Sequence, residues 1–139
     1  EYWSYMKFGP MLELMIGGLD IIELTIEFHV VPDPNGRPQQ KIWLAAVNRE
    51  WETRELAPGY TGICWRDRPA VSRIGDSPLE PLPMVGLTYG INILPVWESV
   101  YRANGIALLP TSIRGSFTVF ASCLDPEERF PVIRVKYRE

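Results

Sequence analysis

In the residues Asp20-Ile-Ile-Glu-Leu-Thr-Ile-Glu-Phe-His-Val30, apolar and polar side chains alternate without a break from Ile22 onward. The side chains of a β-strand point to opposite faces of its sheet with a period of two residues. This stretch therefore predicts a half-buried strand with two unlike faces. The apolar face holds Ile22, Leu24, Ile26, Phe28 and Val30, and the polar face holds Glu23, Thr25, Glu27 and His29.

The segment that follows predicts a tight reversal and a second strand. Between Pro32 and Pro38 lies the pair Asn35-Gly36, which supplies the positive φ angles that a turn needs. Residues 41–47, Lys-Ile-Trp-Leu-Ala-Ala-Val, then have the composition of a returning strand. We expect 20–47 to form a β-hairpin at the centre of the fold.

Two more hairpins are predicted on either side of it. Residues 11–16 favour a strand that Gly17-Gly18 would join to the central strand, with a helix as the alternative because of their Met, Leu and Glu content. Residues 116–124 and 130–137 favour a strand pair whose turn lies at 125–129.

One strand and one helix are predicted between these hairpins. Residues 84–94 favour a strand in which Gly90 marks a bulge or a close approach of another backbone. Residues 95–104 favour the one short helix of the chain, since Pro95 stands in its first turn and Gly105 follows its last residue.

These elements predict a mainly β or α+β fold, an antiparallel, sandwich-like sheet domain built from hairpins. At 139 residues the chain is long enough to form a single domain, 1–139, with its own core. An irregular region rich in Pro and Gly interrupts the pattern at about 57–83. Within it, 77–83 holds three prolines and favours an exposed spacer or a peptide ligand for an aromatic groove.

The charge of the chain is small overall but unevenly distributed. The formal net charge is −3 at pH 7. Residues 1–33 hold six acids and one base, whereas residues 34–75 hold seven bases and four acids. A protein this acidic overall is not an obvious binder of polyanions. The two regions could instead contact each other head to tail between copies.

The composition also bears on the compartment. No apolar run approaches the roughly 20 residues that cross a bilayer, although peripheral membrane contact stays open. Cys64 and Cys123 favour two reduced thiols, so we expect the cytoplasm or the nucleus, with a virion as a further setting. Because the sequence starts at Glu1, we treat it as a fragment from which a targeting segment could be missing.

No arrangement of residues in the sequence predicts an active site, and we expect no cofactor and no metal. His29 could join Glu27 and Glu23 as a metal or catalytic cluster, but a solvated strand face explains the same spacing. Cys64 lies beside Arg66 and Arg68, which would lower a thiol pKa, yet nothing in the sequence brings it to a base.

Two stretches are candidate interaction sites. The N-terminal segment carries four aromatic residues in seven positions, which either dock on the core or form an interface. The loop at 60–73 combines aromatic rings with arginines, as do both protein interfaces and grips on single-stranded nucleic acid. The candidate interface residues are Tyr2, Trp3, Tyr5 and Phe8, and the candidate nucleic-acid-binding residues are Tyr60, Trp65, Arg66, Arg68 and Arg73.

The sequence thus favours a non-enzymatic structural or scaffold domain that associates with itself or docks a protein partner. Small β domains rich in Arg and Pro suit matrix or capsid-associated proteins of virions, which is an analogy of type and not of motif. The alternative is a module that binds single-stranded nucleic acid through the loop at 60–73. An enzyme or metal protein centred on His29 is the third hypothesis.

Overall fold

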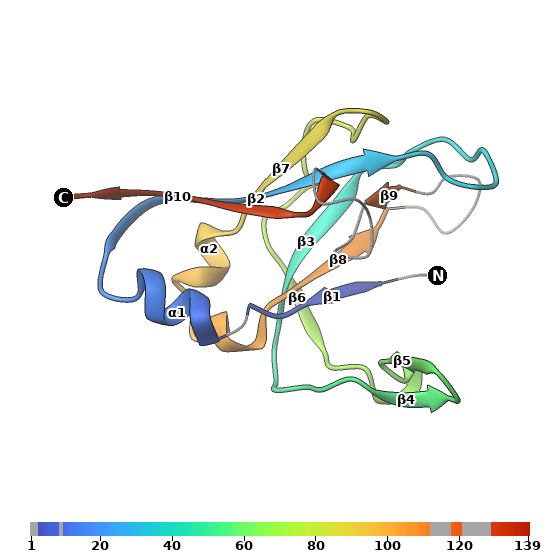
Figure 1. Ribbon diagram of the computed structural model, residues 1–139, viewed down its shortest axis with the longest axis horizontal. Helices are drawn as coiled ribbons and strands as arrows, with labels where there is room; N and C mark the ends of the chain where they lie inside the picture. The colour runs from blue at the N-terminus through green and yellow to red at the C-terminus, as the bar shows by residue number, and fades with distance from the viewer. Residues whose placement is uncertain (1–2, 9, 112–117, 121–128) are drawn as a thin grey trace.

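Two antiparallel sheets build most of the chain in the computed structural model, which describes residues 3–8, 10–111, 118–120 and 129–139 (Figure 1). The molecule is therefore mainly β and antiparallel, as the sequence predicts. Short helical turns, and a small hairpin apart from both sheets, complete the described part of the chain.

The first sheet contains four strands in the order β1-β8-β3-β6. They are β1 (Ser4–Met6), β8 (Ile106–Pro110), β3 (Ile42–Val47) and β6 (Val71–Arg73). Tyr5 pairs with Ala107, Ala107 with Ala45, and Ala45 with Arg73. Because paired residues of an antiparallel sheet point to the same face, this row crosses the sheet on one face.

The second sheet has the order β10-β2-β7, and a further strand, β9, pairs with the end of β2. Its strands are β10 (Val132–Arg138), β2 (Asp20–Val31), β7 (Thr88–Asn92) and β9 (Val119–Phe120). Gly90 of β7 faces β2, where a Cβ atom at position 90 would lie 3.2 Å from Thr25 Cγ2. This neighbour is a side chain, and the pairing of β7 with β2 keeps its register at Gly90, so the bulge or close approach of another backbone predicted there is not found.

The remaining elements are short. The small hairpin is formed by β4 (Arg54–Ala57) and β5 (Tyr60–Gly62), and the α-helices are α1 (Pro10–Ile16) and α2 (Leu94–Trp97). Two 3-10 turns, η1 (Trp65–Asp67) and η2 (Arg102–Asn104), follow the hairpin and α2.

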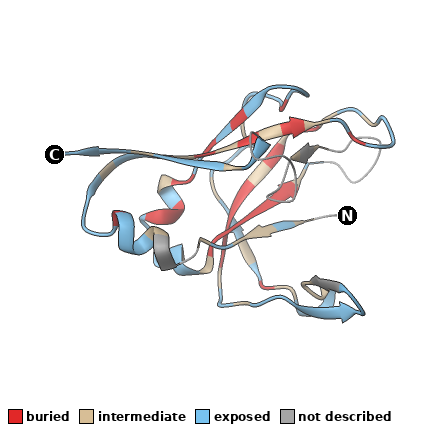
Figure 2. Cartoon of the chain, in the orientation of Figure 1, coloured by how far each residue is buried: buried red, intermediate tan, exposed pale blue. Residues whose placement is uncertain are grey.

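The main core lies between the two sheets and is formed by alternate residues of their strands (Figure 2). In β2, the residues Leu24, Ile26, Phe28 and Val30 are buried, as the alternation predicts. Ile22 is exposed, because the pairing of β2 with β10 shifts register between Lys136 and Tyr137, and Ile21 packs against the core instead. The core also takes in Tyr89, Ile91, Ile93, Val96, Trp97, Ile106 and Leu108.

The predicted central hairpin is wrong, because β2 and β3 belong to different sheets. The turn itself exists: Gly36 has φ 69°, and its N–H donates to the carbonyl of Asp33 over 2.9 Å. The connection then crosses to the other sheet, fixed by an ion pair of 2.8 Å between Arg37 and the buried Asp33 carboxylate. Gln40, also buried, accepts from the backbone N–H of Thr111 over 2.9 Å.

The other two predicted hairpins differ as well. Residues 11–16 form most of the helix α1, the alternative that the sequence left open, so the hairpin with β2 does not form. Of the third hairpin, β9 and β10 both pair with β2, and its remaining residues, 116–117 and 121–128, lie outside the described residues.

The helix predicted over 95–104 is wrong in extent, because α2 ends at Trp97. Ser99 Oγ donates to the carbonyl of Val96 over 2.7 Å and accepts from the N–H of Tyr101 over 3.1 Å. A side chain that takes part in backbone hydrogen bonds in this way competes with the helical pattern. The chain then forms η2 before Gly105.

The region 57–83, which the sequence predicts to be irregular without deciding its order, includes short regular elements. It contains β5, η1 and β6. The segment 77–83 is not a free spacer, because Leu79 packs against the main core and donates its backbone N–H to Ile42 over 2.8 Å. Pro83 is fully buried.

Candidate interaction face

The first sheet has an outer face, turned away from the main core, that carries a second apolar cluster. Its floor is made of Ala45 and Val47 from β3 and of Ala107 and Leu109 from β8, all of them buried. Half-buried aromatic residues cover this floor. They come from β1, from β3 and from the segment before β4: Trp3, Tyr5, Trp43 and Trp51.

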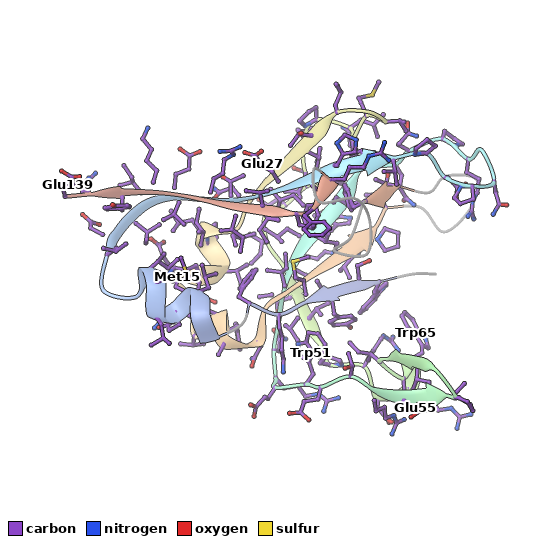
Figure 3. The ribbon with its side chains drawn as sticks, in the orientation of Figure 1. Met15, Glu27, Trp51, Glu55, Trp65 and Glu139 are labelled. Carbon is purple, nitrogen blue, oxygen red and sulfur yellow. The ribbon has the colours of Figure 1, made fainter. Side chains whose placement is uncertain are left out.

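Trp65 extends this surface onto η1, and Figure 3 shows Trp51 and Trp65 on the same side of the molecule. The ring centroids of Trp3 and Trp65 lie 5.2 Å apart at an interplanar angle of 77°. The Arg68 guanidinium lies 3.7 Å from the ring centroid of Trp65 and 4.9 Å from that of Trp3. Arg68 also donates to the carbonyl of Trp65 over 2.7 Å, so both rings and the cation are held together.

A second set of contacts surrounds Trp51. Its indole N–H donates to the carbonyl of Asn104 over 2.7 Å, and its ring meets the edge of Tyr5 with centroids 5.6 Å apart. The Lys7 ammonium lies 4.9 Å from the centroid of the same ring and donates to the Trp51 carbonyl. The Tyr5 hydroxyl donates to the carbonyl of Pro69 over 3.1 Å.

The opposite edge of the sheet adds one more pair. The Arg73 guanidinium lies 4.4 Å from the ring centroid of Trp43. We call these aromatic and cationic side chains together the aromatic face. It comprises Trp3, Tyr5, Trp43, Trp51 and Trp65 together with Lys7, Arg68 and Arg73.

A small lobe, residues 52–68, projects from the two sheets (Figure 1) and is linked to them through the aromatic face. All four residues of β4 are exposed, so the lobe has little core of its own. Ion pairing within it is local: Arg54 contacts Asp67 over 3.1 Å. The position of the lobe therefore depends on the contacts that Trp51, Trp65 and Arg68 make with β1 and its neighbours.

Burial affects the acidity of Tyr5 in this setting. Desolvation raises the pKa of the Tyr5 hydroxyl, and the nearby charges of Arg68 and Arg49 oppose that rise. The hydroxyl is thus kept in its neutral, hydrogen-bond-donating form.

Cys64 lies at the base of the lobe in a half-open hollow of about 190 Å³. The backbone N–H of Arg66 and the side chain of Arg54 hydrogen-bond the sulfur and lower the pKa of the thiol. These contacts favour the thiolate. Glu52 and Asp67 also line the hollow, so its charge is mixed.

The aromatic face joins the two stretches that the sequence predicted separately. Trp3 contacts Trp65 and Arg68, and the Tyr5 hydroxyl donates to the carbonyl of Pro69, the residue after Arg68. Arg73 lies on the same face beside Trp43.

The other predicted interaction residues have different outcomes. Arg66 is exposed on η1, and Phe8 packs against the main core between the sheets. Tyr2 and the side chain of Tyr60 lie outside the described residues.

The sequence did not identify three members of the aromatic face as interaction residues: Lys7, Trp43 and Trp51. For Trp43 a signal exists, because strand alternation places it on the same face as Ala45 and Val47. For Lys7 and Trp51 there is none, since the contact between them joins residues 44 positions apart.

The polar face of β2 carries an ion pair. His29 is half-buried there, and Glu27 pairs with Arg134 of β10. In the described ranges, no three His, Cys, Asp or Glu side chains gather as metal ligands would.

Four acids of the N-terminal region, Glu13, Asp20, Glu27 and Asp33, are paired with arginines of the same chain. Glu13 contacts Arg102 over 2.9 Å, and Asp20 contacts Arg138 over 3.7 Å. Asp33 and Glu27 form ion pairs within the chain as well, so these four carboxylates already have partners in the same molecule.

Comparison with protein-family models, with curated proteins and with solved structures found no match to this chain. Among the described residues, none of the helices is long and apolar enough to cross a membrane.

Proposed function

We propose that this chain is a docking domain that binds a protein partner through the aromatic face. The observation that carries the proposal is the convergence of Trp3, Trp43, Trp51 and Trp65 with stacked Arg68 and Arg73 on one face. Trp, Tyr and Arg dominate the binding energy of protein interfaces, because each offers a large rigid surface with a polar handle.

The rings are already fixed before a partner arrives. Trp65 keeps 46% of its surface exposed while one side of its ring stacks on Arg68. Trp51 and Tyr5 are fixed by hydrogen bonds to the backbone carbonyls of Asn104 and Pro69. A partner that binds such a surface loses less free energy to side-chain ordering than one that binds mobile rings.

The charge of the region favours protein over nucleic acid. Residues 48–73 hold five bases and four acids, a nearly balanced set. Asp67 accepts a hydrogen bond from Arg49 at its carbonyl and an ion pair from Arg54 at its carboxylate. Proteins gain free energy from binding phosphates when their cations displace the counterions of the nucleic acid. Because residues 48–73 hold only one more base than acids, they would displace few counterions and gain little free energy in this way.

The proposal is tested by comparing two exposed aromatic residues of nearly equal exposure. Trp65 lies on the aromatic face, whereas Tyr137, 47% exposed, lies on β10. Immobilised wild-type chain, Trp65→Ala and Tyr137→Ala are used to capture proteins from an extract of the source cells. A captured protein is then purified and titrated directly against each variant.

We expect Trp65→Ala to weaken binding of that protein by roughly 30-fold, as for a hot-spot residue, and Tyr137→Ala to leave it unchanged. Arg68→Ala should weaken it as well, because the guanidinium fixes both Trp65 and Trp3. Equal binding by wild type, Trp65→Ala and Arg68→Ala would refute the proposal.

Binding of single-stranded nucleic acid is the second candidate, and the stack of Trp65 on Arg68 is the observation that favours it. It predicts that mixed oligonucleotides quench Trp fluorescence at low salt and that their affinity falls steeply as salt rises. Absence of quenching at low salt would eliminate this candidate and leave protein docking in place.

A further inference from the structure

The strand β1 lies at an edge of the first sheet and pairs only with β8 among the described residues. We call residues 3–7 the arm. Ser4, Tyr5 and Met6 pair with Leu108, Ala107 and Ile106 in turn. The arm ends three residues before α1 begins at Pro10.

We call the site that binds the arm, β8 together with Gly105, its seat. Gly105 leaves the space in which the backbone of the arm packs. A Cβ atom added at Gly105 would lie 2.0 Å from the carbonyl oxygen of Met6 and 2.9 Å from Lys7 Cα. Gly105 also has φ 81°, a conformation that other L-residues rarely adopt. The backbone of the arm therefore rests directly on this glycine, and a side chain there would displace it.

The contacts that hold the arm all come from distant parts of the sequence. Lys7 reaches Trp51, 44 positions away, and Tyr5 reaches Pro69, 64 positions away. Trp3 contacts Trp65 and Arg68. A groove that recognises the arm through such contacts would bind the same arm from another copy of the chain equally well.

We propose that the arm exchanges between two copies, each arm occupying the other copy's seat on β8 and Gly105. Exchange of an identical element replaces each contact with the same contact in trans, so it is a low-cost route to a dimer. The short link to α1 supports it, since short hinge connections favour exchange over closure in cis. The proposal concerns a second copy and does not depend on the docking of another protein.

Exchange has a consequence for the aromatic face. Trp3, Tyr5 and Lys7 would come from one copy, whereas Trp51, Trp65 and Arg68 would come from the other. Each dimer would then carry two complete aromatic faces related by a two-fold axis.

The test is a disulfide that can form only in trans. Ser4→Cys is made in one full-length chain and Leu108→Cys in another, because Ser4 and Leu108 are paired in register. Both chains also carry Cys64→Ser and Cys123→Ser, and one carries a tag that changes its mass. The two are mixed, unfolded and refolded together, and then oxidised.

Two controls fix the interpretation. One chain carrying both Ser4→Cys and Leu108→Cys, the internal control, must form a disulfide between its two introduced cysteines, within one copy or between two copies, which shows that the paired positions accept the bond. Ser72→Cys on β6, at the opposite edge of the sheet, replaces Leu108→Cys as the negative control.

We expect a mixed disulfide between the Ser4→Cys and Leu108→Cys chains, and its loss with Ser72→Cys. Adding Gly105→Ala to the Leu108→Cys chain should abolish it, provided that circular dichroism shows the variant to be folded. Tyr5→Ala in the Ser4→Cys chain should lower its yield and serves if Gly105→Ala does not fold.

No mixed disulfide, with the internal control closed, would overturn the proposal. A dimer formed through another surface gives the same negative result, because Ser4 and Leu108 would then not meet between copies. If the mixed disulfide forms but wild type, Trp65→Ala and Arg68→Ala bind the captured protein equally, the exchange is supported and the proposed docking function is refuted.

Discussion

Replacing Trp51 with Ala tests whether the lobe is held by the aromatic face. Trp51 lies just before β4 and is fixed by the carbonyl of Asn104 and by the edge of Tyr5. Its loss removes the main link between the lobe and the sheet, whereas the main core between the sheets keeps all its residues.

The magnitude follows from the contacts of the ring. The hydrogen bond to Asn104 contributes about 1 kcal/mol. The edge contact with Tyr5 adds about 1 kcal/mol, and the exposed cation over the ring, Lys7, adds about 0.5 kcal/mol. We therefore expect Trp51→Ala to lower the free energy of unfolding by about 2 to 3 kcal/mol.

Two measurements check this value. Urea unfolding followed by circular dichroism gives the global loss, and trypsin cleavage after Arg54 in native buffer reports opening of the lobe. Trp51→Phe is the matched control: it keeps a ring beside Tyr5 but loses the donor to Asn104, so it should cost about 1 kcal/mol. A loss below about 0.5 kcal/mol for Trp51→Ala, with unchanged cleavage after Arg54, would show that the lobe is held by something else.

Three further predictions concern the crossing between the sheets and the polar face of β2. Gln40→Ala removes the acceptor of the Thr111 N–H and should lower the free energy of unfolding by about 1–3 kcal/mol in urea titrations. The pKa of Asp33 is lowered chiefly by its hydrogen bond from Arg37. The Asp33 carboxylate therefore stabilises the fold fully above the unfolded-state pKa of about 3.9, and this stabilisation is lost as the pH falls through the lower folded-state pKa. Asp33→Asn should therefore flatten the acid limb of a plot of urea midpoint against pH, and an unchanged limb would contradict this. His29→Ala should change the urea midpoint by less than the equivalent of about 0.5 kcal/mol and should leave partner binding unchanged, and a larger effect would reveal a role for the polar face.

Local features of the fold could be predicted from the sequence. The alternation in 20–30 identified β2 and its buried face, and Asn35-Gly36 identified a real turn. Both depend on residues that are neighbours along the chain. Helix α1 could only be left as an alternative, since six residues give too little periodicity to separate a strand from a helix.

The pairing of strands could not be predicted in the same way. A turn after β2 is compatible with a hairpin, but β3 pairs instead with β6 and β8, which come 24 or more residues later in the sequence. Ten residues, 32–41, connect the two sheets. The buried Gln40 in this connection bonds Thr111, 71 positions away, and no local pattern predicts that contact. Strand pairing is decided by burial of the faces, which is a property of the whole chain.

The aromatic face was predicted in two halves and not as a unit. Aromatic and arginine content marked Trp3, Tyr5, Trp65 and Arg68 as interaction residues, because such side chains are uncommon in an ordinary loop. Their meeting depends on β1 pairing with β8, about a hundred residues further along the chain. Composition identifies the residue types, whereas the topology decides which of them share a surface.

The position of β2 in the second sheet constrains how the chain is made. Its twelve residues pair with β7 on one edge and with β9 and β10 on the other. During translation, Asp20–Val31 leaves the ribosome before Val119–Phe120 and Val132–Arg138, so the edge of β2 that pairs with β9 and β10 stays open until those strands have been made. We expect nascent chains stalled before Val132 to keep that edge available to chaperones, and release of Arg138 to close it.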